Sequence, residues 1–226
     1  MVEPHWYRSL WQTDPWAAFE PRGLSLLKIE CSEDERRRLR ELDEIPSAVN
    51  HAQLEVLYWL AREASVPGDV VEIGSDQGKS TIAMSWGSSK NKQPCAVNAV
   101  DPFFDGVEMD GAGRVALFQA NLTRFKAGGV LLHRMFSGDY RRERTEPVRL
   151  LFVDAAHDYL NSSHDFLVWR ELIAPRGFIA AHDVDNYDHG PGTRKAFFNC
   201  VLRDARFQLV YHLDNLAVAQ RLDHEA

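Results

Sequence analysis

The sequence predicts an α/β fold: a doubly wound sheet of seven strands, mostly parallel, with helices on both faces. Short apolar segments of strand length alternate with amphipathic helical segments from residue 47 onward. One such strand runs into a turn containing Gly74 and Gly78 and then into a helix, the arrangement that cradles nucleotide-like ligands in Rossmann-like sheets. The last two apolar segments flank Asp214-Asn215 and predict a closing antiparallel hairpin.

Each element is predicted from its own pattern. Leu54, Leu57, Tyr58 and Ala61 follow i, i+3, i+4, i+7 spacing and predict a helix that ends before Pro67. Further helices are expected from residue 79 onward and over 115–125, 166–173 and 196–201, and the seven strands over 70–73, 95–100, 130–133, 150–153, 178–181, 207–212 and 216–221. The segment 137–139 is expected to be a loop after the third strand.

Composition limits the classes of partner. The net charge of -7 argues against a nucleic-acid groove, which needs a basic face. No apolar run approaches the length of a membrane span, and the first thirty residues carry charges where a signal peptide would be apolar. Cys31, Cys95 and Cys200 are too widely spaced for a metal motif and indicate a reducing compartment. We therefore expect a soluble, cytoplasmic protein that binds neither nucleic acid nor membranes.

The chain is expected to divide at residue 46. Residues 1–46 would form an aromatic-rich N-terminal arm and a helix, and residues 47–226 the main domain. The arm contains Trp6, Trp11 and Trp16, and a segment this apolar is expected to pack on the domain, on a second subunit or over the substrate. We expect a homodimer or a larger homo-oligomer.

The spacing of the glycine turn separates three ligand classes. A dinucleotide turn, G-x-G-x-x-G, needs a middle glycine that this chain lacks. A P-loop, G-x-x-x-x-G-K-[ST], is one residue longer than Gly74 to Ser80 allows. Glu72, Gly74 and Gly78 fit the turn E-x-G-x-x-x-G of an S-adenosylmethionine site without adjustment.

Polar side chains stand at the ends of four predicted parallel strands. Glu72, Asp101, Asp154 and the pair His182-Asp183 occupy these ends. Ligands of doubly wound sheets bind at the carboxyl ends of the strands, so we expect one crevice that all of these residues line. A carboxylate placed as Asp101 is can accept both hydroxyls of a ribose.

With these motifs the chain resembles the class I S-adenosylmethionine-dependent methyltransferases over residues 47–221. Within that superfamily, Phe152–Tyr159 (FVDAAHDY) and Ala180–Val184 (AAHDV) resemble the metal-dependent O-methyltransferases that act on sugars of macrolides, of the macrocin and mycinamicin type. Saccharide methyltransferases of polymethylated mannose polysaccharides are similar.

The resemblance implies roles for individual residues. Asp154 and Asp183 match carboxylates that hold Mg²⁺, whereas His182 replaces the usual first carboxylate of the pair. His182 therefore either shifts the site toward a softer metal or is not a ligand. His157, three residues after Asp154, matches the base, and Asp158, His164 and His189 are alternatives for polar roles near the site. The expected cofactor-binding residues are Glu72, Gly74, Ser75, Gly78, Ser80, Asp101, Ser137, Asp139 and Asp154.

The expected reaction is methyl transfer from S-adenosylmethionine to a hydroxyl of a sugar, an oligosaccharide or a glycosylated natural product, with a divalent metal that the resemblance implies to be Mg²⁺. Methyl transfer from a sulfonium needs alignment and deprotonation of the acceptor, which a metal and an imidazole would supply. A catechol or phenol acceptor is the alternative within this class. From another class, Gly78-Lys79-Ser80 and Asp154 would suit a P-loop-like ATP-dependent phosphotransferase. A regulator that binds the cofactor without catalysis is a third interpretation.

Overall fold

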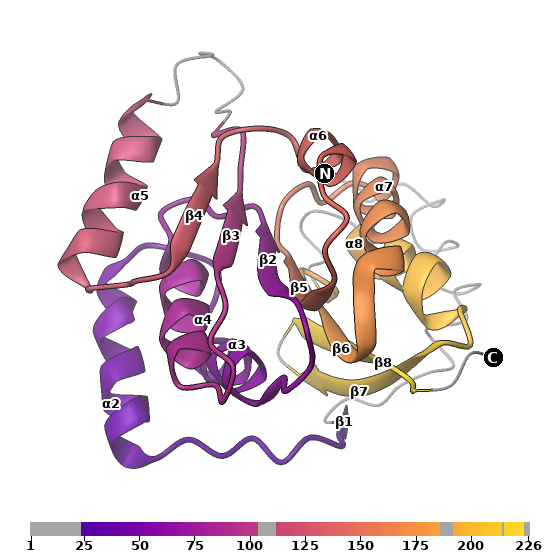
Figure 1. Cartoon of the computed structure of the whole chain (residues 1–226), viewed down its shortest axis with the longest axis horizontal. Coiled ribbons are helices and arrows are strands. Elements are labelled where there is room, and N and C mark those ends of the chain that lie inside the picture. The colour runs from indigo at the N-terminus through magenta and orange to yellow at the C-terminus, as the bar shows by residue number, and fades with distance from the viewer. Residues whose placement is uncertain (1–23, 104–111, 186–191, 214, 224–226) are drawn as a thin grey trace, which may run out of the picture.

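The computed structural model describes residues 24–103, 112–185, 192–213 and 215–223, which form one mixed α/β layer structure (Figure 1). In this part of the chain the sheet has eight strands, in the order β1-β7-β8-β6-β5-β2-β3-β4. The five strands from β6 to β4 in this order are parallel, and β8, β7 and β1 pair antiparallel. The predicted doubly wound fold with its closing hairpin is therefore confirmed.

The strands are β1 (Leu24–Ser25), β2 (Asp69–Ile73), β3 (Val97–Val100), β4 (Val130–His133), β5 (Val148–Val153), β6 (Ile173–His182), β7 (Phe207–Leu213) and β8 (Leu216–Arg221). The helices are α2 (Glu33–Arg40), α3 (His51–Glu63), α4 (Lys79–Ser89), α5 (Ala112–Arg124), α6 (Ser137–Arg142), α7 (Tyr159–Trp169) and α8 (Gly192–Phe197). Two 3-10 turns, η2 (Glu41–Glu44) and η3 (Arg170–Leu172), and a π-helical turn, η4 (Phe198–Leu202), join them. Among the described residues, no helix combines the length and apolar character needed to cross a membrane.

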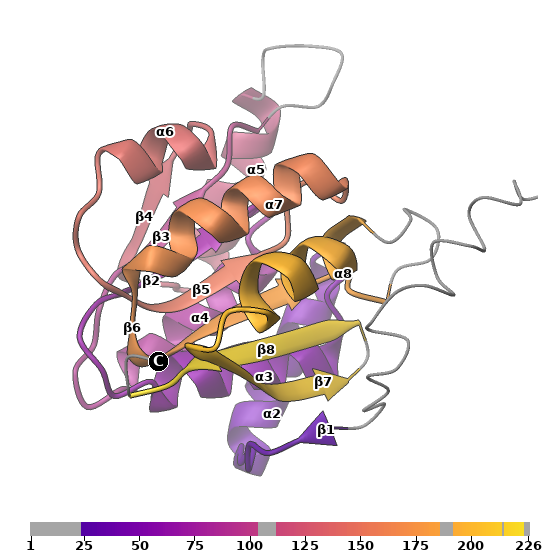
Figure 2. The same cartoon turned by 90° about the vertical axis from the view of Figure 1, so that its right-hand side faces the viewer.

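Consecutive residues of the central strands supply two separate cores, because side chains of a strand alternate between its faces. Val70 and Leu150 belong to the core under α3 and α4, whereas Val71 and Leu151 belong to the core under α7 and α8. Figure 2 shows the second layer, with α7 and α8 lying over the sheet. This two-sided burial explains the nearly continuous apolar sequence of β5.

The structure corrects the strand count from seven to eight. The added strand, β1, is a two-residue edge strand in which Leu24 pairs with His212 and Ser25 with Tyr211. A strand this short leaves no alternation in the sequence, so only its contact with β7 defines it. The predicted contacts of the aromatic residues 1–23 lie outside the described residues.

Two further elements differ from the prediction. The expected loop at 137–139 is the first turn of α6, which Tyr140 anchors: its ring stacks on His133 at 4.0 Å and its hydroxyl donates to Asn98 Oδ1 at 2.8 Å. Ile173, expected in a helix, begins β6 and pairs with Val148. Pro175 and Gly177 lie inside β6 and do not end the helix before it. They occupy an irregular stretch of the strand, where the register between β6 and β5 shifts.

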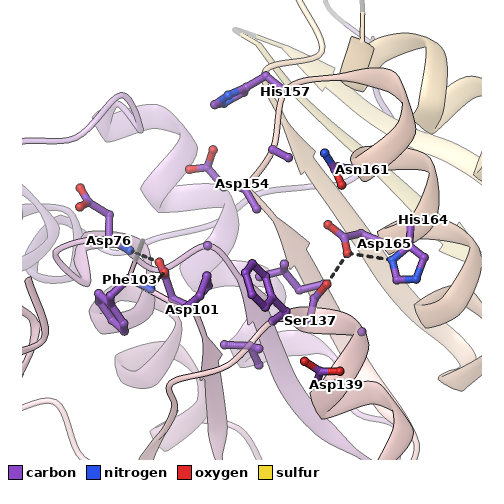
Figure 3. A pocket seen from close by; sticks show the side chains of 18 of the residues that line it. Asp76, Asp101, Phe103, Ser137, Asp139, Asp154, His157, Asn161, His164 and Asp165 are labelled. Atoms are coloured by element: carbon purple, nitrogen blue, oxygen red, sulfur yellow. Dashed lines mark hydrogen bonds and ion pairs between the residues drawn. The ribbon is translucent and has the colours of Figure 1, made fainter. Parts of the chain in front are cut away.

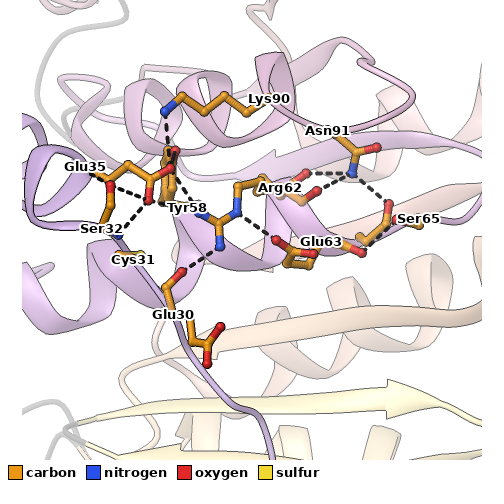
Figure 4. Close-up of polar contacts among 12 residues, drawn as sticks. Glu30, Cys31, Ser32, Glu35, Tyr58, Arg62, Glu63, Ser65, Lys90 and Asn91 are labelled. Carbon is orange, nitrogen blue, oxygen red and sulfur yellow. Dashed lines mark hydrogen bonds and ion pairs between the residues drawn. The ribbon is translucent and has the colours of Figure 1, made fainter.

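Helix α2 is fastened to the main domain through Glu35 (Figure 4). Its carboxylate accepts hydrogen bonds from Tyr58 Oη at 2.5 Å and Arg62 Nη1 at 2.9 Å, and it lies 3.2 Å from Lys90 Nζ. Burial disfavours the charged form, but these donors hold the pKa of Glu35 well below its usual range. The described part of the segment 24–46 thus packs on α3 and α4.

Candidate active site

A pocket lies at the carboxyl ends of β2, β3 and β5 (Figure 3). Its volume is about 890 Å³. The predicted residues that line it are Gly74, Asp101, Ser137, Asp139, Asp154 and His157. Of the five residues predicted at strand ends, Asp101 and Asp154 line this pocket, whereas Glu72, His182 and Asp183 are buried and do not. The expectation that all five line one crevice is therefore wrong, although the pocket does lie at the carboxyl ends of the strands.

The glycine turn needs glycine for two different reasons. Gly74 and Gly78 both have positive φ, 84° and 86°. A Cβ on Gly74 would lie 2.1 Å from the carbonyl oxygen of Asp154, so Gly74 allows β2 to pass close to β5. A Cβ on Gly78 would lie 3.0 Å from the ring of Phe118. Gly78 thus shapes the start of α4 and does not line the pocket.

Glu72 is fully buried and does not reach the pocket surface. Its carboxylate accepts hydrogen bonds from Ser80 Oγ at 2.5 Å and from Thr81 Oγ1, so it joins β2 to the first turn of α4. Burial raises its pKa to about 7, against the effect of these two hydroxyls. Ser80 and Ser75 line a recess of about 40 Å³ beside Gly74 and Asp154.

Asp101 organises the turn from the neighbouring strand. Its Oδ2 accepts the backbone N–H groups of Ser75 at 2.8 Å and Asp76 at 3.0 Å, and its Oδ1 accepts that of Phe103 at 2.6 Å. Each carboxylate oxygen has two lone pairs, so Oδ1 keeps capacity for another donor from the pocket. Both interpretations of the sequence, a turn residue and a ligand-facing carboxylate, are compatible with this geometry.

Ser137 and Asp139 form the side of the pocket away from His157 (Figure 3). The hydroxyl of Ser137 donates to Asp165 Oδ1, which extends from α7. Burial raises the pKa of Asp165, while Ser137 opposes that rise. Asp139 is exposed and pairs with Arg142 Nη1 at 2.7 Å.

Asp154, His182 and Asp183 converge at the ends of β5 and β6. Their ligand atoms all lie within 4.8 Å of one another. His182 is 1% exposed, and its Nδ1 lies 3.2 Å from Asp154 Oδ1 and 3.2 Å from Asp183 Oδ2, without a hydrogen bond of good geometry to either. Burial disfavours a charge on this ring, yet the two carboxylates raise its pKa to about 10.

These three residues fit a divalent cation. His182 Nδ1 faces two carboxylate oxygens without an aligned hydrogen bond, and its raised pKa means that the protonated ring balances their charge when no cation is bound. A divalent cation would take the place of the proton on Nδ1. One nitrogen with two oxygens suits Mn²⁺ and later divalent metals better than Mg²⁺, which prefers oxygen alone.

His157 contacts the same cluster from the loop after β5. Its Nε2 lies 2.5 Å from Asp183 Oδ2, and Asp183 raises the pKa of His157 against the effect of burial. Asp183 has a positive φ of 58°, and its Oδ1 accepts a hydrogen bond from Asn215 Nδ2 at 2.9 Å. Its carboxylate is therefore held from two sides.

Residues 71–184 match a family model described as a methyltransferase domain, which is half of the chain. The chain belongs to this methyltransferase family. The matched region begins in β2 and ends just after β6, so it contains the strand ends that carry the pocket. The predicted class of enzyme is confirmed, and no curated protein matches the sequence.

Solved structures share the fold of this methyltransferase at low sequence identity. An O-methyltransferase from Bacillus cereus, in complex with SAH, has a TM-score of 0.61 and 17% identity, covering 94% of this chain and 99% of that chain. TomG from Streptomyces achromogenes, an O-methyltransferase of tomaymycin synthesis in complex with SAM, has a TM-score of 0.60 and 17% identity, covering 98% and 100%. CalS11, a TDP-rhamnose 3'-O-methyltransferase of calicheamicin biosynthesis, has a TM-score of 0.55 and 16% identity, covering 85% and 96%.

His164 of α7 lines the pocket, as one alternative from the sequence expected, while Asp158 caps that helix and His189 lies outside the described residues. Two other residues of α7 were not predicted. Asn161 and Asp165 line the pocket, and their i, i+4 spacing places both on the helix face that carries polar groups. The i, i+4 spacing of Asn161 and Asp165 was the feature of the sequence that could have predicted their place in the pocket. Asp76 and Arg114, which pair at 3.2 Å, also line the pocket and left no such signal, because their contact joins the glycine turn to α5.

Proposed function

We propose that the protein transfers a methyl group from S-adenosylmethionine to a hydroxyl oxygen of a sugar, an oligosaccharide or a glycosylated natural product, with a divalent cation. One observation carries this proposal: a single pocket is lined by Asp101, beside the glycine turn, and by Asp154 and His157. Behind these two, Asp183 lies against both Asp154 and His157. Similar structures support it, since two are O-methyltransferases in complex with SAH or SAM and CalS11 is a TDP-rhamnose 3'-O-methyltransferase.

The cofactor would lie along the glycine turn. Asp101 would accept the ribose hydroxyls, Gly74 and Ser75 would face the methionine portion, and Ser137 and Asp139 would border the adenine. Glu72, Gly78 and Ser80 would act by holding the turn in place, since Glu72 is buried against Ser80 and Thr81.

Asp154, His182 and Asp183 would hold the cation. A divalent cation at this place would lower the pKa of a bound acceptor hydroxyl, as it does for bound water. The carboxylates of Asp154 and Asp183 would balance the charge of the cation, because two carboxylates this close to one another need a positive partner.

His157 would accept the proton of the acceptor. Asp183 accepts the Nε2–H of His157, so the neutral ring carries its lone pair on Nδ1, as in other carboxylate–histidine pairs. In the reaction the acceptor oxygen bonds to the methyl carbon, the sulfur keeps the electrons of the broken S–C bond, and Nδ1 takes the proton. The products are the methyl ether and S-adenosylhomocysteine.

A phenol or catechol acceptor is the second candidate, because the pocket also has apolar walls at Phe103 and Phe136. The phosphotransferase interpretation loses its support. Lys79, the lysine that a P-loop would use, is buried and lies 3.4 Å from Asp43 Oδ1. The proposed homo-oligomer and the proposed role of residues 1–46 as a lid or an oligomer contact stay predictions.

The cofactor is tested by thermal unfolding of the full chain with S-adenosylhomocysteine, ATP or NAD. S-adenosylhomocysteine should raise Tm, and Asp101→Ala should remove most of that rise. Labelled methyl transfer to a panel of sugars and phenols, with and without chelator, then identifies the acceptor class and the need for metal. A rise in Tm with ATP alone would contradict the proposal.

A further inference from the structure

Gln53 connects the start of α3 to the buried ring of His182. Gln53 is the third residue of α3 and is 3% exposed. His182 is the last residue of β6, 129 residues later in the chain. The side-chain oxygen Oε1 of Gln53 lies 3.2 Å from His182 Nε2. This contact is not part of the reaction described above.

The helix cap fixes which way the amide of Gln53 points. Its Oε1 accepts the backbone N–H of Asn50 at 2.8 Å, while Asn50 Oδ1 accepts the backbone N–H of Gln53 at 3.0 Å. The two contacts form a capping box. A backbone N–H can only donate, so the atom of Gln53 that faces it is the amide oxygen and not the amide nitrogen.

The orientation of Gln53 decides which nitrogen of His182 keeps its proton when a cation binds. An amide oxygen only accepts, so His182 Nε2 must be the donor in this contact. In the neutral ring the lone pair is then on Nδ1, the atom that lies 3.2 Å from both Asp154 Oδ1 and Asp183 Oδ2. Without Gln53, the two carboxylates would favour a proton on Nδ1, and that tautomer has no lone pair to offer a cation there.

We propose that Gln53 is a positioning residue for the metal site: the capping box of α3 holds the ring of His182 so that Nδ1 faces the cation. This inference rests on the metal-dependent part of the proposed function. Metal-binding histidines generally donate their other ring N–H to an oxygen acceptor, and loss of that acceptor typically weakens metal binding by about 10- to 100-fold.

Three variants separate this role from simple capping. Gln53→Met removes the acceptor and half of the capping box while keeping the side-chain length. Gln53→Glu keeps an acceptor for His182 and is itself a regular capping-box residue. Asn50→Ala removes the other half of the box but leaves its backbone N–H and Gln53 Oε1 in place, so it is the matched control for loss of the cap.

The test is calorimetric titration of the full chain with Mn²⁺, with S-adenosylhomocysteine binding measured on the same samples. We expect Gln53→Met to weaken Mn²⁺ binding by about 10- to 100-fold. Gln53→Glu and Asn50→Ala should bind Mn²⁺ as the unmutated protein does, and all variants should keep their affinity for S-adenosylhomocysteine.

Several outcomes would overturn the inference. Unchanged Mn²⁺ binding in Gln53→Met, or an equal loss in Asn50→Ala, would reduce Gln53 to a helix cap. A tenfold loss in Gln53→Glu, which keeps an acceptor oxygen, would show that acceptance from His182 Nε2 is not what supports the metal site. Absence of Mn²⁺ binding by the unmutated protein would remove the metal site and this inference together, while binding of S-adenosylhomocysteine would leave the methyltransferase proposal standing. If Gln53→Met does not fold, the ring ¹⁵N chemical shifts of His182 in the Zn²⁺-loaded unmutated protein still decide: a metal bound to Nδ1 with the proton on Nε2 is expected, and a proton on Nδ1 would overturn the inference.

Discussion

Replacing Glu72 by glutamine should make the stability of the protein less dependent on pH. Glu72 is fully buried, and its pKa is about 7 in the folded protein against an ordinary value of 4.5. The glutamine side chain has nearly the same shape and can still accept a hydrogen bond from Ser80 or Thr81, so the turn between β2 and α4 should persist. The variant therefore removes the titrating carboxyl group of Glu72 and keeps the hydrogen bonding between β2 and α4 largely intact.

The sign and size of the effect follow from linkage. Because the folded-state pKa is raised, the folded protein binds more protons than the unfolded chain between pH 4.5 and pH 7. The contribution of Glu72 to stability is present below pH 4.5 and is lost as pH rises through 7. One pKa unit corresponds to about 1.4 kcal/mol, so the loss amounts to about 3 kcal/mol.

The assay is urea unfolding of the unmutated protein and Glu72→Gln at pH 4.5 and pH 8, without cofactor or metal. The free energy of unfolding of the variant, relative to that of the unmutated protein, should rise by about 3 kcal/mol between the two pH values. Glu41→Gln, at an exposed position, is the control for a general change of charge. If the difference between the unmutated protein and Glu72→Gln is the same at both pH values, Glu72 is not held neutral by burial and the reasoning is refuted.

Two predictions concern turnover. His157→Ala should lower turnover by about 10²- to 10⁴-fold with little change in affinity for S-adenosylhomocysteine. Asp183 raises the pKa of His157 above 6.5, so the rate of the unmutated enzyme should fall as pH drops through a value above 6.5. The pH–rate profile of the variant should lack this acidic limb. Gly192→Ala should lower turnover by about 10²-fold, because its Cβ would lie 2.1 Å from the carbonyl oxygen of His157 and displace the loop. Gly128→Ala, where a Cβ meets nothing within 4 Å, is the control, and equal rates for the two glycine variants would show that the loop tolerates the displacement.

The sequence by itself determined the sheet and the location of the pocket. Alternating apolar and amphipathic segments predict β2 to β8 and, with the exception of α6, the helices between them, since burial on both faces demands apolar residues such as those of β5. Parallel strands share one carboxyl edge, so polar residues at their ends, such as Asp101 and Asp154, meet in one place wherever the helices lie. The spacing of Gly74 and Gly78 was equally local, because a positive φ is a property of the turn itself.

The tertiary structure alone decided which polar groups face the pocket and which face one another. Glu72 and Asp101 are both acidic residues near strand ends, yet the first is buried against α4 and the second lines the pocket. Edge strand β1, the inward face of α7 and the contact of Gln53 with His182 join residues far apart in the chain. No periodicity records such contacts, because they depend on the packing of whole elements against each other, and packing is set by side-chain volume and hydrogen-bond partners in three dimensions.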